Sequence, residues 1–291
     1  MRSSSANRSP RNCWPTVQPR SCANCTPAPD PVNPNPPCNL AGLSVLVTRP
    51  AHQSDSLCDL IQTAHGRPVR FPALEILGPG DKHAARLALA GASTADLLIF
   101  VSANAVQFAF PLLPAQLPVD VDIAAVGTAT AHALEEKGLD PTLVPQRMDS
   151  EGLLQLPALQ SAHGKSVFIL RGNGGRELLG ETLRERGATV QQVEVYRRQL
   201  PQRAGAAANL VRNWSQLAQV VTATSNMILD NLFDLLGDAG AELLCTTPLV
   251  VVSQRMAEHA LERGCQSVYV AASATDADVL ATLCEVNDDV A

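Results

Sequence analysis

The chain has 291 residues, of which 46% are hydrophobic, 17% are charged and only 3% are aromatic. This composition predicts a globular α/β protein with two domains of ordinary size and an aliphatic core. The formal net charge of -6 disfavours a general nucleic-acid or anionic-membrane surface, and the scarcity of rings disfavours a protein that stacks bases.

Residues 1–40 differ from the rest of the chain. They carry four arginines and a single acid, and prolines crowd positions 27–39, where they remove donors and fix φ. The segment contains no apolar stretch of the signal-peptide kind, and no run in the chain approaches the roughly 18 apolar residues of a membrane span. We therefore expect a disordered Pro/Ser/Cys-rich tail over 1–40 and a cytoplasmic protein without membrane contact.

The eight cysteines fall into two groups. Cys22 and Cys25 in the tail have the spacing of a metal knuckle, but Cys13 and Cys38 fit no zinc module, so we expect no metal site there. The other four occur singly in apolar contexts and are predicted to be small core residues in a reducing compartment: Cys58, Cys245, Cys265 and Cys284.

From Leu40 onward, short apolar runs alternate with segments of helical period, which indicates βαβ units. The pattern occurs twice. Each copy consists of a first strand–helix–strand unit and a second unit of three strands with intervening helices. The strand segments that match between the copies are 44–49 with 166–171, 69–77 with 190–196, 97–104 with 220–226, 123–127 with 249–253, and 142–144 with 267–270. This duplication predicts two doubly wound, flavodoxin-like parallel sheets, whose ligands bind beyond the carboxyl ends of the strands. Two such domains would face one cleft.

Polar residues concentrate at those strand ends. The glycine-rich segment 171–176 offers free N–H groups and two guanidinium groups, so it is either a carboxylate- or phosphate-binding device or a plain strand-to-helix turn. It lacks the glycine spacing of a dinucleotide loop, and no Walker lysine follows. The turns 102–104 and 224–226 have the same two interpretations, with ordinary helix capping as the plainer one.

Two further features lie at the strand ends. The segment 127–130 opens a helix and presents backbone N–H groups and two hydroxyls. Tyr196 ends a strand where the chain should cross between domains, and it is interpreted either as a proton donor to a ligand or as a half-buried hinge residue. The six histidines form no pair at ligand spacing, so we expect no metal and no cofactor.

Taken in order, these residues resemble the uroporphyrinogen-III synthase family over about residues 43–285. The matching segments are Val47-Thr-Arg-Pro50, 100–106, 125–130, Arg171-Gly-Asn173 with Arg176, and Val195-Tyr-Arg197. Ser253 departs from the pattern, because some relatives have glycine at this turn, as the first copy does at Gly127.

The resemblance implies an architecture and a reaction. It implies domain 1 over 41–74 plus 200–291, domain 2 over 79–193, and hinge crossovers at 73–77 and 194–199. It also implies cyclisation of hydroxymethylbilane to uroporphyrinogen III, with inversion of ring D and loss of water. Transient contact with hydroxymethylbilane synthase is a further expectation, and a monomer is expected because no oligomer interface is readable.

The resemblance also assigns roles to the residues at the strand ends. Tyr196 would assist departure of the hydroxyl. The residues expected to bind the carboxylates of the substrate are Arg49, Ser102, Asn104, Gly127, Thr128, Thr130, Arg171, Gly172, Asn173, Arg176, Thr224, Ser225, Ser253 and Gln254. The alternative is a non-enzymatic α/β regulator that binds a small anion or a tetrapyrrole and would not need Tyr196.

Overall fold

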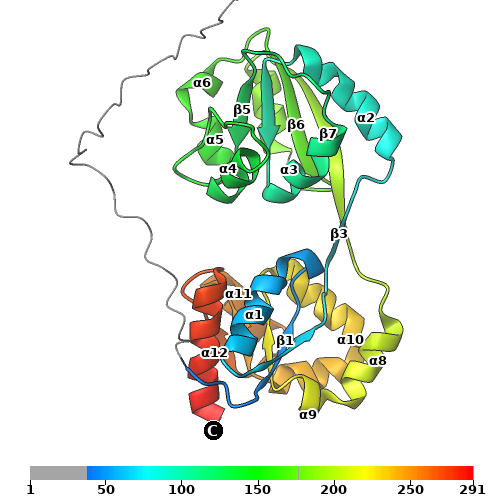
Figure 1. The fold of residues 1–291 in the computed structure, drawn as a ribbon, viewed down its shortest axis with the longest axis vertical. Coiled ribbons are helices and arrows are strands. Elements are labelled where there is room, and N and C mark those ends of the chain that lie inside the picture. The colour runs from blue at the N-terminus through cyan, green and yellow to red at the C-terminus, as the bar shows by residue number, and fades with distance from the viewer. Residues whose placement is uncertain (1–37, 176, 291) are drawn as a thin grey trace, which may run out of the picture. The chain divides into compact units, whose positions relative to one another are not determined.

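The computed structural model describes residues 38–175 and 177–290, which form two five-stranded sheets covered by helices (Figure 1). The first sheet has the order β10-β9-β8-β1-β2, and all of its neighbouring strands are parallel. Its strands are β1 (Ser44–Val47), β2 (Arg67–Arg70), β8 (Val220–Thr222), β9 (Leu249–Val251) and β10 (Val268–Val270). The strand order reverses between β1 and β8, as it does in the flavodoxin-like arrangement.

Helices cover both faces of this first sheet because its strands bury side chains on both sides. Along β1, Leu46 packs into one core with residues of α8, α10 and α11, whereas Val45 and Val47 pack into another with residues of α1 and α12. The helical elements are η1 (Ala51–Gln53), α1 (Asp55–Thr63), α8 (Ala204–Arg212), α9 (Trp214–Leu217), α10 (Asn226–Thr246), α11 (Gln254–Glu262) and α12 (Asp276–Val290).

The second sheet has the order β3-β7-β6-β4-β5, in which β7, β6, β4 and β5 are parallel and the edge strand β3 is antiparallel. Its strands are β3 (Glu75–Leu77), β4 (Leu97–Phe100), β5 (Asp122–Ala125), β6 (Ser166–Gly172) and β7 (Thr189–Gln199). Leu98 and Phe100 face one core, and Leu97 and Ile99 face the other. The helical elements are α2 (Lys82–Ala90), η2 (Gly91–Thr94), α3 (Ala103–Ala109), η3 (Phe110–Leu112), α4 (Thr128–Glu135), α5 (Ser150–Leu154), α6 (Pro157–Gln160) and α7 (Leu178–Glu185).

Strand β7 changes partner along its length. Its first part pairs in parallel with β6, as far as Gly172 opposite Tyr196, and the register shifts between Arg171 and Gly172. Its last residues pair antiparallel with β3, which lies beside them in Figure 1. Tyr196 is therefore the last residue of β7 to pair with β6.

Two segments differ from the predicted strands. The apolar run 69–77 is not one strand, because it divides into β2 in the first sheet and β3 in the second. The strand predicted at 142–144 is reduced to a single bridge between Leu143 and Ala124. Pro141 and Pro145 flank that bridge, and neither has an N–H to extend the ladder.

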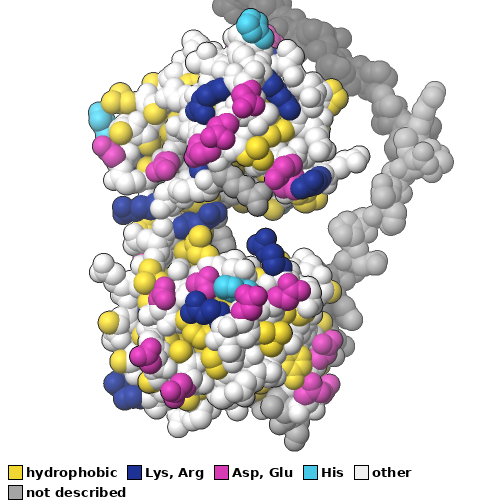
Figure 2. Space-filling model, turned by 180° about the vertical axis from the view of Figure 1, so that it is seen from behind, with side chains coloured by type: hydrophobic (Ala, Val, Ile, Leu, Met, Phe, Trp, Pro, Cys, Tyr) yellow, Lys and Arg dark blue, Asp and Glu magenta, His cyan; other side chains and the backbone are white. Residues whose placement is uncertain are grey.

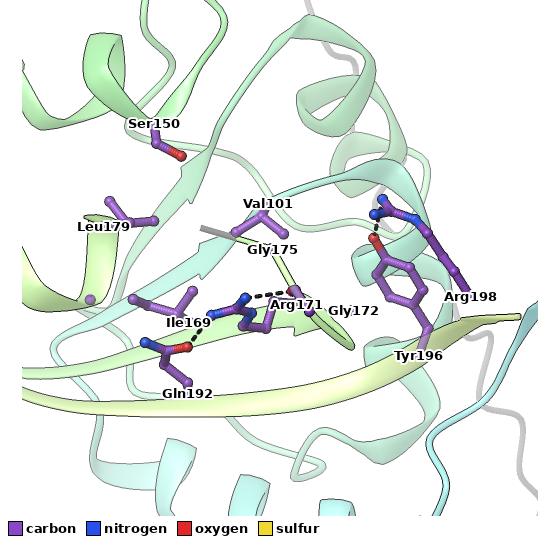
Figure 3. A pocket seen from close by; sticks show the side chains of 12 residues that line it. Val101, Ser150, Ile169, Arg171, Gly172, Gly175, Leu179, Gln192, Tyr196 and Arg198 are labelled. Carbon is purple, nitrogen blue, oxygen red and sulfur yellow. Dashed lines mark hydrogen bonds between the residues drawn. The ribbon is translucent and has the colours of Figure 1, made fainter. Parts of the chain in front are cut away.

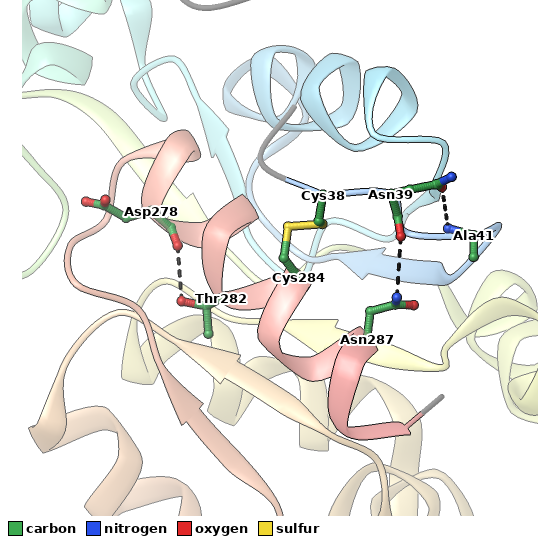
Figure 4. The surroundings of a disulfide bond; sticks show 7 residues. All are labelled: Cys38, Asn39, Ala41, Asp278, Thr282, Cys284 and Asn287. Atoms are coloured by element: carbon green, nitrogen blue, oxygen red, sulfur yellow. Dashed lines mark hydrogen bonds between the residues drawn. A yellow bond between two sulfur atoms is a disulfide. The ribbon is translucent and has the colours of Figure 1, made fainter. Parts of the chain in front are cut away.

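The predicted boundary of the tail is wrong at its end. Leu40 is fully buried, and its N–H donates to the carbonyl of Ala64 at 2.7 Å. Cys38 forms a disulfide with Cys284 of α12 (Figure 4). Residues 38–40 therefore belong to the folded body, because the run of prolines ends at Pro37 and the side chains of Cys38 and Leu40 then pack against the same core. The metal knuckle considered at Cys22 and Cys25 lies outside the described residues.

Three of the four cysteines predicted to be core thiols are free, and the fourth forms the disulfide. Cys58 and Cys265 are buried as predicted, and Cys245 is half-buried. Burial raises the pKa of the Cys58 thiol. Burial, with Cys245 nearby, raises the pKa of Cys265 to about 12, so this thiol stays protonated at neutral pH. Cys284 is not a free core thiol, because Cys38 lies close enough to pair with it.

The described surface carries charges of both signs. Figure 2 shows acidic side chains interspersed with basic ones on the face that it draws. This face lacks the continuous basic stripe by which a protein tracks a nucleic-acid backbone. Within the described ranges, no helix is long and apolar enough to cross a membrane.

The disulfide leads to the first testable prediction. It closes a loop with a sequence separation of 246 residues, and long closed loops restrict the unfolded chain most strongly. We expect Cys284→Ser to lower the free energy of unfolding of the oxidised protein by about 2–4 kcal/mol. Denaturant titration measures the change, and peptide mapping without reductant confirms the bond.

Cys245→Ser is the matched control, because Cys245 is a free thiol. A reductant should destabilise the wild type and the Cys245→Ser protein, and should leave Cys284→Ser unchanged. Equal stability of the wild type with and without reductant would contradict the prediction.

Candidate functional site

The phenol ring of Tyr196 lies where β6 and β7 end their pairing. The side chain is 1% exposed and belongs to the core on one face of the second sheet. Its ring packs against Gly172, where an added Cβ would lie 2.6 Å from two ring carbons. Phe108 of α3 stacks on it with centroids 6.1 Å apart. A residue with a side chain at position 172 would displace the ring.

Two side chains hold the hydroxyl of Tyr196. Arg198 Nη2 donates to the phenolic oxygen at 2.9 Å, and its guanidinium carbon lies 5.4 Å from the ring centroid. Ser102 Oγ lies 3.1 Å from the same oxygen. Ser102 also accepts the N–H of Ala105 at 3.1 Å and so caps α3. One serine thus connects the start of a helix to the phenol.

The phenol and Arg198 border a cavity of about 170 Å³ (Figure 3). The apolar part of its lining comes from Val101, Ile169 and Leu179, and the polar part comes from Arg171, Gln192, Ser150 and the glycine loop that follows β6. The cavity therefore lies at the carboxyl ends of β4 and β6, where a doubly wound sheet binds its ligands.

Arg171 supports the wall of this cavity. It is 8% exposed and donates to Glu177 at 2.8 Å, to Gln192 and to the carbonyl of Gly174. Hydrogen bonds from Gln192 and Arg171 hold the pKa of the Glu177 carboxyl below its ordinary value. The charge of Arg171 is thus matched within the protein, and the guanidinium shapes the loop 172–175.

Asn173 continues the strand pairing beyond the register shift. Its backbone N–H donates to the carbonyl of Tyr196 at 3.1 Å. Its side-chain oxygen accepts the N–H of Arg198 at 2.6 Å, and its Nδ2 donates to the carbonyl of Arg198 at 3.3 Å. Asn173 therefore fixes the backbone of β7 from the carbonyl of Tyr196 to Arg198.

The start of α4 brings three predicted residues to the same edge of the second sheet. Gly127 is the N-cap and has no side-chain cap bond. Thr128 is exposed and donates to Met148 Sδ at 3.5 Å, whereas Thr130 is only 5% exposed. Thr128 is therefore the more accessible hydroxyl. Asn104 is half-buried in the first turn of α3.

The other predicted residues follow strands of the first sheet. Ser225 caps α10 by accepting the N–H of Ile228 at 3.2 Å, and Ser253 caps α11 by accepting that of Met256 at 3.3 Å. The capping interpretation thus holds at the turn 224–226, as it does at Ser102. The polar residues next to these caps are the half-buried Thr224 and the exposed Gln254.

Arg49 also belongs to the carboxyl edge of the first sheet, directly after β1. It is 8% exposed and binds Asp276 and the carbonyl of Ala274. Its charge is therefore matched within the protein. Arg176 lies outside the described residues.

Arg198 is not among the site residues that the sequence predicts. The signal was available, because alternate residues of a strand share one face and Tyr196 and Arg198 are two positions apart on β7. The motif considered there ended at Arg197, which is exposed.

Across the described ranges, no group of three or more His, Cys, Asp or Glu residues could hold a metal ion.

The fold and the site define a doubly wound α/β protein with a tyrosine-centred cavity at the carboxyl edge of one sheet. A family model described as uroporphyrinogen-III synthase matches residues 55–281. The chain belongs to the uroporphyrinogen-III synthase family, as the resemblance implied. The non-enzymatic alternative is not favoured.

Relatives agree with this assignment, and solved structures agree with the fold. The chain is 39% identical to uroporphyrinogen-III synthase of Escherichia coli (strain K12) and 36% identical to that of Salmonella typhimurium, and each match covers 83% of this chain and 100% of the relative. A mutant uroporphyrinogen III synthase from Thermus thermophilus matches with a TM-score of 0.59 and 17% identity, over 85% of this chain and 100% of the other. A uroporphyrinogen-III synthetase from Helicobacter pylori 26695 matches with a TM-score of 0.54 and 16% identity, over 86% of this chain and 100% of the other. At these identities the structures support the fold alone.

The contact between Gly172 and Tyr196 leads to a second prediction. We expect Gly172→Ala to force the ring away from Ser102 and Arg198, because the new Cβ would lie 2.6 Å from ring carbons. Turnover should fall at least about 10-fold, since small misplacements at a reacting centre are costly. Steady-state kinetics of the purified variant measures the loss.

Gly205→Ala is the control for this variant. Gly205 lies in α8 with nothing within 4 Å of an added Cβ, so alanine there should favour the helix. Full activity of Gly172→Ala would show that the close packing of the ring is not needed.

Proposed function

We propose that the chain cyclises hydroxymethylbilane to uroporphyrinogen III, inverting ring D and releasing water. The observation that carries the proposal is the hydroxyl of Tyr196, held by Arg198 and Ser102 beside a cavity in a member of this family. The relatives named uroporphyrinogen-III synthase match over most of the chain and support it.

The proposed reaction needs a proton for the departing hydroxyl. A phenol at hydrogen-bond distance from that hydroxyl supplies it as a general acid. Departure leaves an azafulvene cation, which is reactive without further activation, so the protein must above all determine which carbon attacks. A buried ring with a fixed hydroxyl suits both demands.

The substrate also brings eight carboxylates that need donors. The starts of α10 and α11, capped by Ser225 and Ser253, have the partial positive charge that attracts anions. At the start of α4, exposed Thr128 is better placed to bind a carboxylate than buried Thr130. Arg49 and Arg171 are paired with acids, so they contribute mainly by shaping the site.

The remaining expectations form part of the same proposal. They are domain 1 at 41–74 plus 200–291, extended to Cys38 by the contacts described above, domain 2 at 79–193, and the hinge crossovers at 73–77 and 194–199. A cytoplasmic monomer without cofactor and transient contact with hydroxymethylbilane synthase complete them. In a reducing cytoplasm Cys38 and Cys284 would stand mainly as thiols, so the stability difference expected above concerns the purified, oxidised protein.

The test couples the purified protein to a source of hydroxymethylbilane and separates the porphyrin isomers after oxidation. We expect the type III isomer, which requires the inversion of ring D. Uncatalysed closure gives the symmetrical type I isomer and is the background of the assay. Detection of type I alone would overturn the proposal.

Tyr196→Phe tests the role of the phenol. Removing a general acid typically costs a factor of 100 or more, and we expect kcat to fall about 100-fold at the low end of that range. The ring remains to fill its place against Gly172, so thermal unfolding should change little. Unchanged turnover would remove Tyr196 from the mechanism.

A further inference from the structure

The hydrogen bonds at the phenolic oxygen can be assigned one by one. A phenol has one proton to donate and can also accept. The guanidinium of Arg198 can only donate, so its bond at 2.9 Å uses an acceptor position of the Tyr196 oxygen. This bond does not consume the proton of the phenol.

Ser102 constrains the assignment further. Its Oγ already accepts the N–H of Ala105, and its own proton can point to the phenolic oxygen 3.1 Å away. With Ser102 and Arg198 both donating, the proton of Tyr196 remains free for a ligand in the cavity. When the phenol gives up that proton, the same two donors stabilise the oxygen that is left.

The charge of Arg198 distinguishes it from Arg171 and Arg49, the two buried arginines at the carboxyl ends of strands. Arg171 is paired with Glu177, and Arg49 is paired with Asp276. Within the described part of the chain, no acid forms an ion pair with Arg198, and its guanidinium contacts the hydroxyl and ring of Tyr196. Asn173 holds its backbone from both sides.

We propose that Arg198, together with Ser102, is a positioning residue that leaves the proton of Tyr196 free for the substrate and stabilises the phenolate formed when that proton is transferred. The inference rests on the proposed function, since it concerns the same site. In the step itself, the phenolic O–H bond breaks as the substrate's C–O bond breaks, and the hydroxyl leaves as water with the proton of Tyr196. A proton returns to the phenolate when the product loses one on ring closure, so no other reactant is needed.

The main test is a double-mutant cycle of Arg198→Gln and Tyr196→Phe. We expect Arg198→Gln to lower kcat about 10-fold, as loss of a charged hydrogen bond does, with KM changed less than about twofold. In the Tyr196→Phe background the same change should have no further effect, because residues that act as a unit are not additive.

Two further variants separate this role from a general loss of charge or fold. Arg198→Lys retains a cationic donor and should recover part of kcat. Arg197→Gln removes an equal charge from the exposed neighbour and should leave kcat unchanged. Thermal unfolding of each variant checks that the fold is intact.

The outcomes distinguish the two proposals. A wild type that makes only the type I isomer overturns the proposed function. An active wild type overturns the inference about Arg198 if Arg198→Gln retains full kcat. The inference also fails if Arg198→Gln raises KM instead of lowering kcat. It fails too if Arg198→Gln lowers kcat by the same factor with phenylalanine at position 196 as with tyrosine. A raised KM would show that Arg198 contributes to substrate binding, and an equal loss in both backgrounds would show that it acts independently of the phenol.

Discussion

The close packing of the Tyr196 ring on Gly172 is the constraint on which the site depends. The ring needs the space that a missing side chain leaves, and the register shift after Arg171 brings Gly172 opposite Tyr196. Immediately beyond, β7 leaves β6 and pairs with β3. The phenol is thus held by the second sheet at the point where β7 exchanges β6 for β3 as its partner.

Polar side chains around this point hold the phenol and the backbone segments beside it. Asn173 holds the backbone of β7, Arg171 holds the glycine loop, and Ser102 joins the phenol to α3. Each buried charge that shapes the wall is matched, as that of Arg171 is by Glu177, which limits the cost of burying it. The guanidinium of Arg198, which no acid of the described residues pairs, contacts the phenol. Paired charges that shape the wall, with one guanidinium directed at the phenol, suit a reaction that depends more on positioning than on strong acids or bases.

Several features could be predicted from sequence because they depend on local periodicity. Strands that bury both faces read as continuous apolar runs, as at 97–100 and 249–251, so the parallel sheets were evident. The differences between prediction and structure have separate physical causes. Cys284 looked like a core thiol because nothing local reveals Cys38 as its partner. The strand expected around Leu143 contracted to one bridge between two prolines, and Arg198 was passed over because its role comes from contacts with Tyr196 and Asn173.

The sequence by itself determined the duplicated α/β pattern, the polar strand ends and the resemblance to one enzyme family, because these follow from short-range spacing and residue type. Only the tertiary structure decided which of the polar residues act as helix caps, which arginines are neutralised by acids and which side chains meet the phenol. Those properties depend on pairs such as Ser102 with Tyr196 and Arg49 with Asp276. Their members are far apart in the chain, and folding alone brings them within hydrogen-bond distance.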